Sequence, residues 1–422
     1  MRCIVPSVWK DAQDIVDKIR LPEIPEKEYH VKISSGEDIR QELQAMLDLC
    51  SASGGGRVIV PQGVYRCNGP LNLRSSTELH FEDGCVIKFS PHPEHYLPQV
   101  FTRWEGVEIY NFSPMVYGKD LTDVAVTGKA TFIGGNEIFA SWLGLQNEAQ
   151  ERSRSFAEQG VPVEQRVFSE KDHLRASMFQ IVSSERILIE EITLTNAPFW
   201  MFHPLYCRDV TFRNVACDSM FLNNDGIDID SCENVLIEDS VFRNGDDAIV
   251  VKSGRDHDGW RVGRPTKNVV IRNCHIYEAM HGVAIGSELS GGAENIWISN
   301  ISMDKIFRQA IQFKSNRDRG GVIRNVNVRD ISVEHVDGNL IYFFSDYPGF
   351  RNGNAPTAFR DFRLEKIRCG YAANVFHLQG TPEFPLENIE IDDITVEKCD
   401  VVYASLEYAG NTVLNDLFLP EK

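Results

Sequence analysis

The sequence predicts an all-β protein built as a single-stranded right-handed parallel β-helix, a solenoid, with an N-terminal helical cap and inserted loops. Three observations support this fold class: a short phrase recurs along the chain, each repeat carries a second short strand, and no long helical stretch separates the repeats. The 422 residues are 42% hydrophobic and 25% charged. This is ordinary globular composition, which excludes disordered and low-complexity chains.

The recurring phrase reads apolar, any residue, apolar, polar, polar, apolar, as in residues 187–192 and 296–301. Its alternation and its β-branched residues are typical of a strand. Repeats of about 20–50 residues indicate a solenoid or a propeller, and the Trp-Asp signature of propeller blades does not occur. The phrase begins at residues 187, 210, 235, 269, 296, 326, 362 and 389, so successive copies lie 23 to 36 residues apart.

A second short apolar strand completes each repeat, for example at residues 227–229, 248–251 and 283–285. Two or three short strands per repeat, joined by turns, are typical of a parallel β-helix. Its successive coils stack about 4.7–4.9 Å apart. Residues one repeat apart in the sequence are therefore expected to be neighbours in space.

The N-terminal third fits the same solenoid. We expect residues 1–35 to be an extension with an amphipathic helix at about 8–19, and residues 36–422 to be one β-helix domain. Apolar residues with helical spacing predict a helix over 37–49, which is the candidate end cap. Strands are expected from Arg57 onward.

Two segments interrupt the repeat. Residues 136–177 hold a polar stretch, at about 145–158, that is expected to be helical, and residues 254–265 form a second, shorter insert. Long inserts in a solenoid tend to lie on one face and to carry function. These two inserts are therefore expected to wall off one end of a groove.

The formal net charge of −18 disfavours general binding of nucleic acid or of an anionic membrane. A membrane span is not expected, because no run of 18 apolar residues occurs. The N-terminus shows no signal peptide, so the expected location is cytoplasmic, or secreted or periplasmic if a leader has been removed.

The ten cysteines form no Cys-x-x-Cys pair and are expected to be buried thiols, although a secreted setting would permit disulfides. The oligomeric state is left open.

Carboxylates concentrate at two turns about one coil apart. Asp225 lies in Asn-Asn-Asp-Gly and Asp246 lies in Gly-Asp-Asp, each just before the second strand of its repeat. The next two coils place His281 and Lys314 at corresponding positions. One face of the solenoid is therefore expected to gather Asp225, Asp246, Asp247, His281 and Lys314.

This set suits hydrolysis of an acetal, in which an acid protonates the leaving oxygen and a base activates water. Close carboxylates push their pKa values apart, which can leave one protonated and another ionised. Two other interpretations stand beside this one. Asp-Gly is also a common turn sequence, so the aspartates could be structural; Asp228 and Asp230 are expected to be so, because their alternation directs them along the strand and not at the turn. Clustered Asp residues could also bind Ca²⁺.

At these residues the chain resembles glycoside hydrolase family 28, the polygalacturonase family. That family carries Asn-Thr-Asp-Gly, Gly/Gln-Asp-Asp, Gly-His-Gly and Arg-Ile-Lys in this order. The chain offers the ordered counterparts 223–226, 245–247, 280–282 and 312–314. The resemblance extends from about residue 36 to the C-terminus.

The resemblance implies inverting hydrolysis of α-linked galacturonic acid in an anionic pectic oligosaccharide or polysaccharide, without a metal or other cofactor. By motif, Asp246 corresponds to the general acid, and Asp225 with Asp247 to the pair that activates water. His281 would support the protonation state of the acid, and Lys314 would bind a substrate carboxylate. An exo-acting enzyme is expected rather than an endo-acting one.

The chain departs from the family motifs at two positions that matter for these roles. Gln312 replaces the motif Arg, which removes a bidentate carboxylate donor; Arg308, Arg317 or Arg319 are candidates to compensate. Met280 replaces the first Gly of Gly-His-Gly. The predicted substrate-binding residues are Lys314, Gln312, Arg255, Arg308 and Lys252.

Three other functions remain open at this point. A rhamnogalacturonan-type hydrolase would use a related site, although Asp247 favours the polygalacturonase type. A β-helix lyase or epimerase would have a different catalytic centre, and for a lyase this would need Ca²⁺ and an Arg or Lys base. A non-catalytic carbohydrate-binding β-helix would tolerate loss of Asp246.

Overall fold

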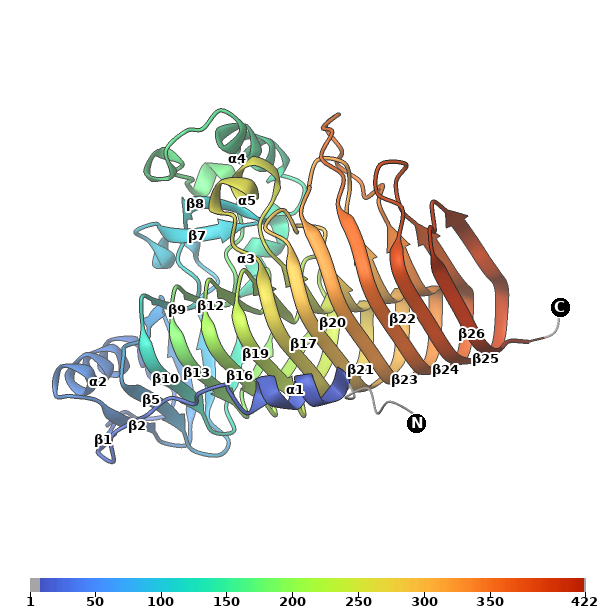
Figure 1. The fold of residues 1–422 in the computed structure, drawn as a ribbon. Helices are drawn as coiled ribbons and strands as arrows, with labels where there is room; N and C mark the ends of the chain where they lie inside the picture. The colour runs from blue at the N-terminus through green and yellow to red at the C-terminus, as the bar shows by residue number, and fades with distance from the viewer. Residues whose placement is uncertain (1–7, 421–422) are drawn as a thin grey trace.

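The computed structural model describes residues 8–420 and shows a parallel β-helix whose coils stack along one axis (Figure 1). In the described residues one 24-stranded sheet runs through all coils, and each of its strand pairs is parallel. The hairpin β7 (Val100–Trp104) and β8 (Val107–Asn111) forms a separate antiparallel pair. The predicted fold class is confirmed.

The strands before the long coils are short. In chain order they are β1 (Glu28–His30), β2 (Gly56–Val60), β3 (Val64–Cys67), β4 (Leu71–Asn72), β5 (Thr77–Phe81), β6 (Val86–Phe89), β9 (Val116–Lys119), β10 (Thr122–Thr127), β11 (Thr131–Ile133), β12 (Phe179–Val182), β13 (Glu185–Glu190), β14 (Thr193–Thr195), β15 (Phe202–Leu205), β16 (Arg208–Arg213), β17 (Ala216–Ser219), β18 (Ile227–Asp230) and β19 (Glu233–Glu238).

Later strands continue around the corners of the coil without a break. They are β20 (Val241–Lys252), β21 (Thr266–Ile285), β22 (Ala293–Lys314), β23 (Val322–Phe344), β24 (Ala358–Gln379), β25 (Glu387–Glu407) and β26 (Thr412–Phe418). The helices are α1 (Val8–Val16), α2 (Arg40–Ala52), α3 (Asn136–Phe139), α4 (Asn147–Glu158) and α5 (Asp256–Val262), with 3-10 turns η1 (Pro93–Tyr96), η2 (Ala140–Trp142), η3 (Val163–Gln165) and η4 (Glu170–Asp172).

The recurring phrase sets the register between coils. Its first residues pair one with the next through eight coils, for example Val269 with Ile296 and Ile296 with Val326. The apolar positions of the phrase point inward and build a continuous core along the axis. The sequence repeat therefore predicted both the strands and their alignment.

Residues with positive φ mark the two ends of the phrase. In one coil these are Asn268 (φ 58°) and Asn273 (φ 56°). Asn is several-fold enriched in this left-handed region among non-Gly residues. Its amide also bonds along the stack: Asn295 donates to Asn268 at 3.0 Å, and Asn325 donates to Asn295 at 2.8 Å. The polar residues of the phrase are thus corners of the coil.

Helix α2 caps the first coil with Leu43, Leu47 and Cys50 buried. It begins at Arg40, three residues later than the predicted start at 37. The reason is local, since the Asp38 carboxylate accepts a hydrogen bond from the Arg40 N–H and holds the preceding residues in a turn. The predicted N-terminal helix is also present as α1, which packs on the outer face of β19, β21 and β22 (Figure 1).

The two predicted inserts lie together on one side of the coils, where α4 and α5 are adjacent (Figure 1). Helix α4 matches the helical stretch expected within 136–177, whereas the insert 254–265 contains the short helix α5. Buried Asp258 of α5 accepts from Arg166 at 2.9 Å and from the backbone N–H of Glu108 at 2.7 Å. This ion pair ties α5 to the first insert and to the β7–β8 hairpin.

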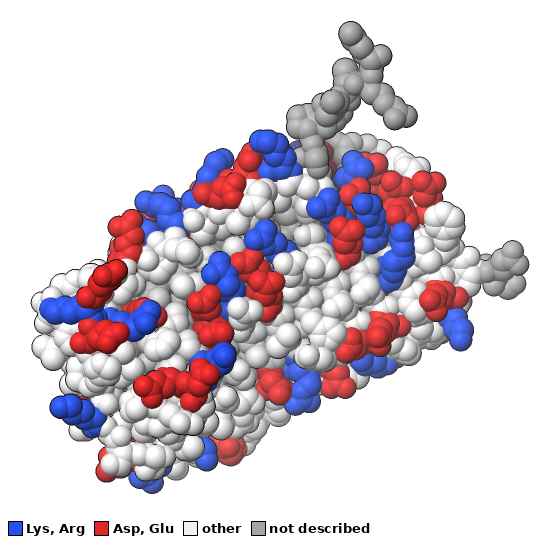
Figure 2. All heavy atoms as spheres, turned by 90° about the horizontal axis from the view of Figure 1, so that it is seen from below, with Lys and Arg blue, Asp and Glu red and all other residues white. Residues whose placement is uncertain are grey.

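The nine cysteines from Cys50 to Cys399 are free thiols, and all but Cys399 are buried, as predicted for these residues; Cys3 lies outside the described residues. On the face seen in Figure 2, acidic and basic side chains alternate instead of gathering by sign. Within residues 8–420, the helices are all too short or too polar to cross a bilayer.

Candidate active site

A cleft of about 630 Å³ opens on the coils beside the inserted helices. Six of the nine predicted site residues line it: Asp225, Asp246, Asp247, Lys252, Arg255 and Lys314. These residues come from three stretches of chain, 225, 246–255 and 314, and the stacking of coils brings them together. The gathering of carboxylates on one face, predicted from the repeat, is present.

The register places Asp247 opposite Asp225. Ile227 pairs with Ile249, and the Gly226 N–H donates to the Asp247 carbonyl at 2.9 Å. On the other side Asp247 pairs with His281. Glycine is required at 226 because a Cβ there would lie 2.4 Å from the Ala248 carbonyl oxygen, so the Asp-Gly turn follows from the close stacking of coils.

Asp247 is a buried carboxylate with two cationic partners. Lys314 Nζ lies 3.1 and 2.9 Å from its two carboxylate oxygens, and His281 Nδ1 lies 2.8 Å from Oδ1. Burial alone would raise the pKa of Asp247, but Lys314 and His281 outweigh it and hold this pKa below its usual range. Asp247 is therefore ionised at neutral pH.

Asp225 has the opposite tendency. Its side chain is buried, and burial raises its pKa well above the ordinary value. The nearby carboxylates of Asp228 and Asp246 raise it further, while Lys252, 3.8 Å away, opposes them. The cleft thus holds one carboxyl group that favours the proton and one that favours the charge.

Asp246 is the most accessible of the three carboxyl groups, with 24% of its side chain exposed. Its Oδ1 accepts the Asp247 N–H at 3.1 Å and lies 3.7 Å from His281 Nδ1. Burial would lower the pKa of His281, but the contacts with Asp246 and Asp247 raise it above the usual value. His281 supports the carboxylate pair from behind the cleft wall.

Lys252 and Arg255 line the cleft within a network of charges. Lys252 Nζ lies 3.1 Å from Glu288 and 4.6 Å from the centre of the Trp200 ring. Arg255 contacts Glu288 at 2.7 Å and Glu105 at 3.2 Å. Both cations are thereby fixed at the cleft wall, with Glu288 as their common partner.

Two predicted substrate-binding residues do not reach the cleft. Gln312 is buried on β22 between Ala284 and Tyr342 of the neighbouring coils. Arg308 is exposed further along β22, and no ion pair with it occurs among the described residues. The other candidates to replace the motif Arg are paired elsewhere, since Arg317 contacts Glu383 and Arg319 contacts Asp256.

The predicted structural role of two further aspartates agrees with their placement under the cleft. Asp230 accepts from Arg103 of the β7–β8 hairpin at 2.7 Å, and both side chains are fully buried. Asp228 is buried 3.6 Å from Lys252 Nζ. Asp230 anchors the hairpin, whereas burial raises the pKa of Asp228 well above its ordinary value.

Sequence reasoning missed several residues that line the cleft: Glu105, Arg154, Trp200, Glu288 and Tyr347. Glu105 lies in the β7–β8 turn, Arg154 on α4, and Tyr347 in the loop after β23. Such loop positions have no place in the repeat register, so spacing could not align them with the aspartates. Glu288 directly follows the strand of His281, which is the one signal that could have found it.

The calcium alternative is disfavoured by the donor set. Within the described part of the chain, ligand atoms of Asp246, Asp247 and His281 lie within 4.8 Å of one another, as a cation site would need. However, Ca²⁺ takes about 6–8 oxygen ligands, and the Lys314 ammonium already contacts both oxygens of Asp247. The cluster fits proton transfer better than it fits Ca²⁺.

We expect His281→Gln to destabilise the protein mainly at acidic to neutral pH. Because the folded-state pKa of His281 is raised, its contribution to stability is complete below the unfolded value of about 6.5 and is lost as the pH rises through the folded value. Urea unfolding of both proteins at about pH 5.5 and about pH 9, on either side of the titration, measures this. The difference between the two midpoints should shrink at the higher pH.

His335→Gln is the matched control. His335 also contacts a carboxylate, Asp337 at 2.8 Å, but it is 41% exposed, so solvent screens the pair. Its replacement should leave the pH dependence of the midpoint unchanged. A pH-independent difference for His281→Gln would mean that His281 packs as a neutral side chain.

Comparison with known proteins gives a consistent assignment. The family model described as glycosyl hydrolases family 28 matches residues 164–412. The chain is 27% identical over 369 residues to a "Probable polygalacturonase" of Vitis vinifera, covering 84% of this chain and 70% of that protein. The solved structure of a hyperthermoactive exopolygalacturonase from Thermotoga maritima is 31% identical, with a TM-score of 0.87 over 97% of this chain and 96% of that one. A family 28 exopolygalacturonase of Yersinia enterocolitica shares the fold, with a TM-score of 0.71 at 17% identity over 94% of this chain and 78% of that one. Because the family model covers more than half of its length, the chain belongs to glycosyl hydrolase family 28.

Proposed function

We propose that this protein hydrolyses α-linked galacturonic acid in pectic oligosaccharides or polysaccharides and that it acts from a chain end. The main support for this proposal is that three carboxyl groups meet in one cleft, where Asp247 is ionised and Asp225 favours its proton. The names of the relatives, polygalacturonase and exopolygalacturonase, support the same substrate and the exo mode.

In the proposed reaction, Asp246 gives its proton to the glycosidic oxygen as the bond to the anomeric carbon breaks. A water molecule held by the pair Asp225 and Asp247 attacks that carbon from the opposite face and loses a proton to Asp247, the ionised member of the pair. Asp247 suits the base role because Lys314 and His281 keep it ionised. Asp246 suits the acid role because it is the most accessible of the three carboxyl groups.

The walls of the cleft support action at a chain end. Arg154 of α4 and Tyr347 with Pro348 of the loop after β23 both line it, and Arg255 precedes α5. These segments are inserts and loops that rise above the regular coils. A cleft closed in this way accepts the end of a chain more easily than its middle.

We expect the first product to carry the inverted anomeric configuration. An acid that protonates the leaving oxygen while a base directs water to the opposite face of the sugar gives a single displacement, which inverts the anomeric carbon. ¹H NMR of the earliest product from a long polygalacturonate chain measures the configuration before mutarotation. Inverted monogalacturonate as the first product would support both the mechanism and the exo mode.

Other products would contradict the proposal in distinct ways. A retained anomer would exclude single displacement. An unsaturated sugar end would identify a lyase, and products of mixed length would identify an endo-acting hydrolase.

A further inference from the structure

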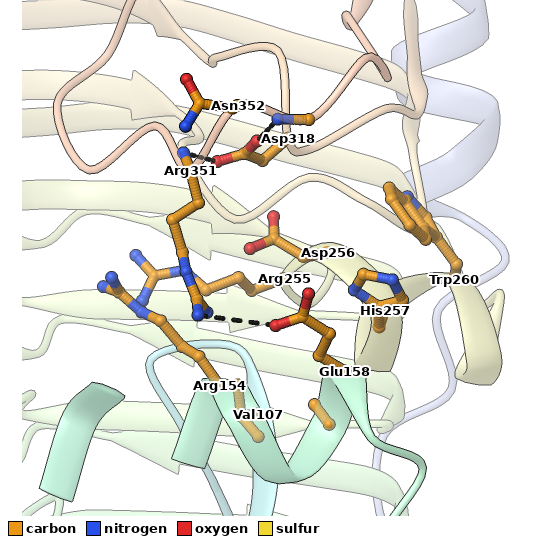
Figure 3. Close-up of a pocket in the computed structure, with 12 residues that line it drawn as sticks. Val107, Arg154, Glu158, Arg255, Asp256, His257, Trp260, Asp318, Arg351 and Asn352 are labelled. Atoms are coloured by element: carbon orange, nitrogen blue, oxygen red, sulfur yellow. Dashed lines mark hydrogen bonds and ion pairs between the residues drawn. The ribbon is translucent and has the colours of Figure 1, made fainter. Parts of the chain in front are cut away.

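A second pocket of about 650 Å³ lies beside the catalytic cleft, between α4, α5 and the loop after β23 (Figure 3). We call it the outer pocket. Arg154 and Arg255 line both cavities, so the two are direct neighbours. Arg351 and Trp260 line the outer pocket but not the cleft. The outer pocket is thus built largely from the segments that depart from the regular repeat.

Three guanidinium groups converge in the outer pocket. Figure 3 shows the side chains of Arg154, Arg255 and Arg351 directed toward one another. The Nε atoms of Arg154 and Arg255 are buried and have no hydrogen-bond partner among the described residues. Burial, together with the like charge of Arg255, lowers the pKa of Arg154 to about 10. Carboxylates of the protein contact all three groups, but unequally: Arg154 pairs with Glu151 at 2.8 Å and Arg255 with Glu288 at 2.7 Å, whereas Arg351 lies 3.5 Å from Glu158 and 3.9 Å from Glu151.

Two acidic residues that line the outer pocket are engaged by other groups. Asp318 accepts the backbone N–H groups of Arg351 and Gly353 at 2.5 and 2.6 Å, and Asp256 accepts from Arg319 at 2.6 Å. Glu158 contacts Arg351 at 3.5 Å, but about half of its side chain is exposed to solvent. Arg351 thus has only long contacts with half-exposed carboxylates, which are weak in water, so its guanidinium is the group most open to an anionic ligand.

An aromatic side chain forms the opposite wall. Trp260 is 41% exposed, and its Nε1 is fixed by a hydrogen bond to the Arg319 carbonyl at 2.8 Å. The His257 ring packs 4.9 Å from the indole ring, and the exposed part of the indole offers an apolar surface against which a sugar ring can pack. Guanidinium groups that recognise a carboxylate, together with a flat apolar wall, match the two sides of a sugar acid.

We propose that the outer pocket binds a second uronosyl residue of the substrate chain, with its carboxylate at Arg154 and Arg351 and its ring on Trp260. This rests on the proposed function, because the uronosyl residue belongs to the chain being cleaved. It also explains how the protein binds carboxylates although Gln312 replaces the motif Arg and lies outside the cleft. Arg154, on the inserted helix α4, takes the place of the motif Arg as a cation that binds a substrate carboxylate.

The test compares Arg351→Met with wild type on two substrates. Trigalacturonate can occupy both cavities, whereas p-nitrophenyl galacturonide carries a single uronate. Loss of one charge-assisted contact should raise KM for trigalacturonate roughly tenfold or more, with KM for the aryl glycoside changed less than twofold. Binding of trigalacturonate to the Asp246→Asn protein, with and without Arg351→Met, measured by calorimetry, should weaken by the same factor.

Two further variants keep the result interpretable. Arg152→Met is the control, because Arg152 lies on α4 near Arg154 but contacts Asp172 and the Phe168 ring; it should change KM for neither substrate. Trp260→Ala should also affect trigalacturonate selectively, which guards against misfolding of a single variant. Equal effects on both substrates, or none for Arg351→Met, would overturn the outer-pocket proposal. Failure of the wild-type protein to cleave either galacturonide would instead overturn the proposed function.

Discussion

Asp246→Asn is expected to keep the fold and to lower kcat on trigalacturonate by about 10²–10⁴-fold, the usual contribution of a general acid. Asn has nearly the same shape and can still accept the Asp247 N–H, which Asp246 Oδ1 accepts at 3.1 Å. It cannot give a proton to the glycosidic oxygen. Because the leaving group then departs unprotonated, the loss should fall on kcat and leave binding of the substrate nearly unchanged.

Stopped assays of reducing ends give kcat, and calorimetry with trigalacturonate gives binding. Asp218→Asn is a matched control, since Asp218 is a surface carboxylate whose contact with Arg243 at 2.7 Å lies away from the cleft. A variant that kept more than about a third of the wild-type kcat, where a general acid is worth about 10²–10⁴-fold, would remove Asp246 from the acid role.

The repeat made most of the fold predictable. Each phrase alternates along a strand and ends in a residue such as Asn273, which turns the corner with positive φ. The same pattern therefore specifies strand, corner and register at once, so the alignment of phrases reproduces the pairing of Val269 with Ile296. Local hydrogen bonding moved the start of α2, because the Asp38 side chain competes for the Arg40 N–H.

The site was only partly predictable, because the repeat aligns residues of the coils but not residues of the hairpin and the inserts. His281 and Lys314 lie on regular strands, and counting repeats placed them beside the aspartates. Spacing alone did not show that Asp247 stands opposite Asp225, because the turn between Ser219 and Ile227 is longer than the corresponding turn in the next coil. Residues from the hairpin and the inserts, such as Glu105 and Arg154, depend on tertiary contacts that no periodicity encodes.

Lys314 pairs with a carboxylate of the protein itself, a contact that the sequence motif does not indicate. The resemblance assigns it to a substrate carboxylate, and it is fixed on the protein's own Asp247 by contacts of 2.9 and 3.1 Å. Both side chains are buried. Removing one partner of such a pair leaves an uncompensated buried charge, which is far more costly than losing an exposed pair.

We therefore expect Lys314→Met to lower kcat at least tenfold on charged and uncharged glycosides alike, and to change the pH profile. An opposite charge at this distance lowers a carboxyl pKa by roughly 1–3 units, so without Lys314 the pKa of Asp247 should rise by a similar amount. Because the base must be ionised, the acidic limb of the kcat profile should move to higher pH by that amount. An additional loss confined to galacturonides would show that Lys314 also binds the substrate carboxylate.

Lys305→Met is the matched control, since Lys305 lies on the same strand with a surface partner, Asp337 at 2.6 Å. An acidic limb that stayed in place, in a variant with the wild-type unfolding midpoint, would mean that Asp247 is not the ionised base of this site.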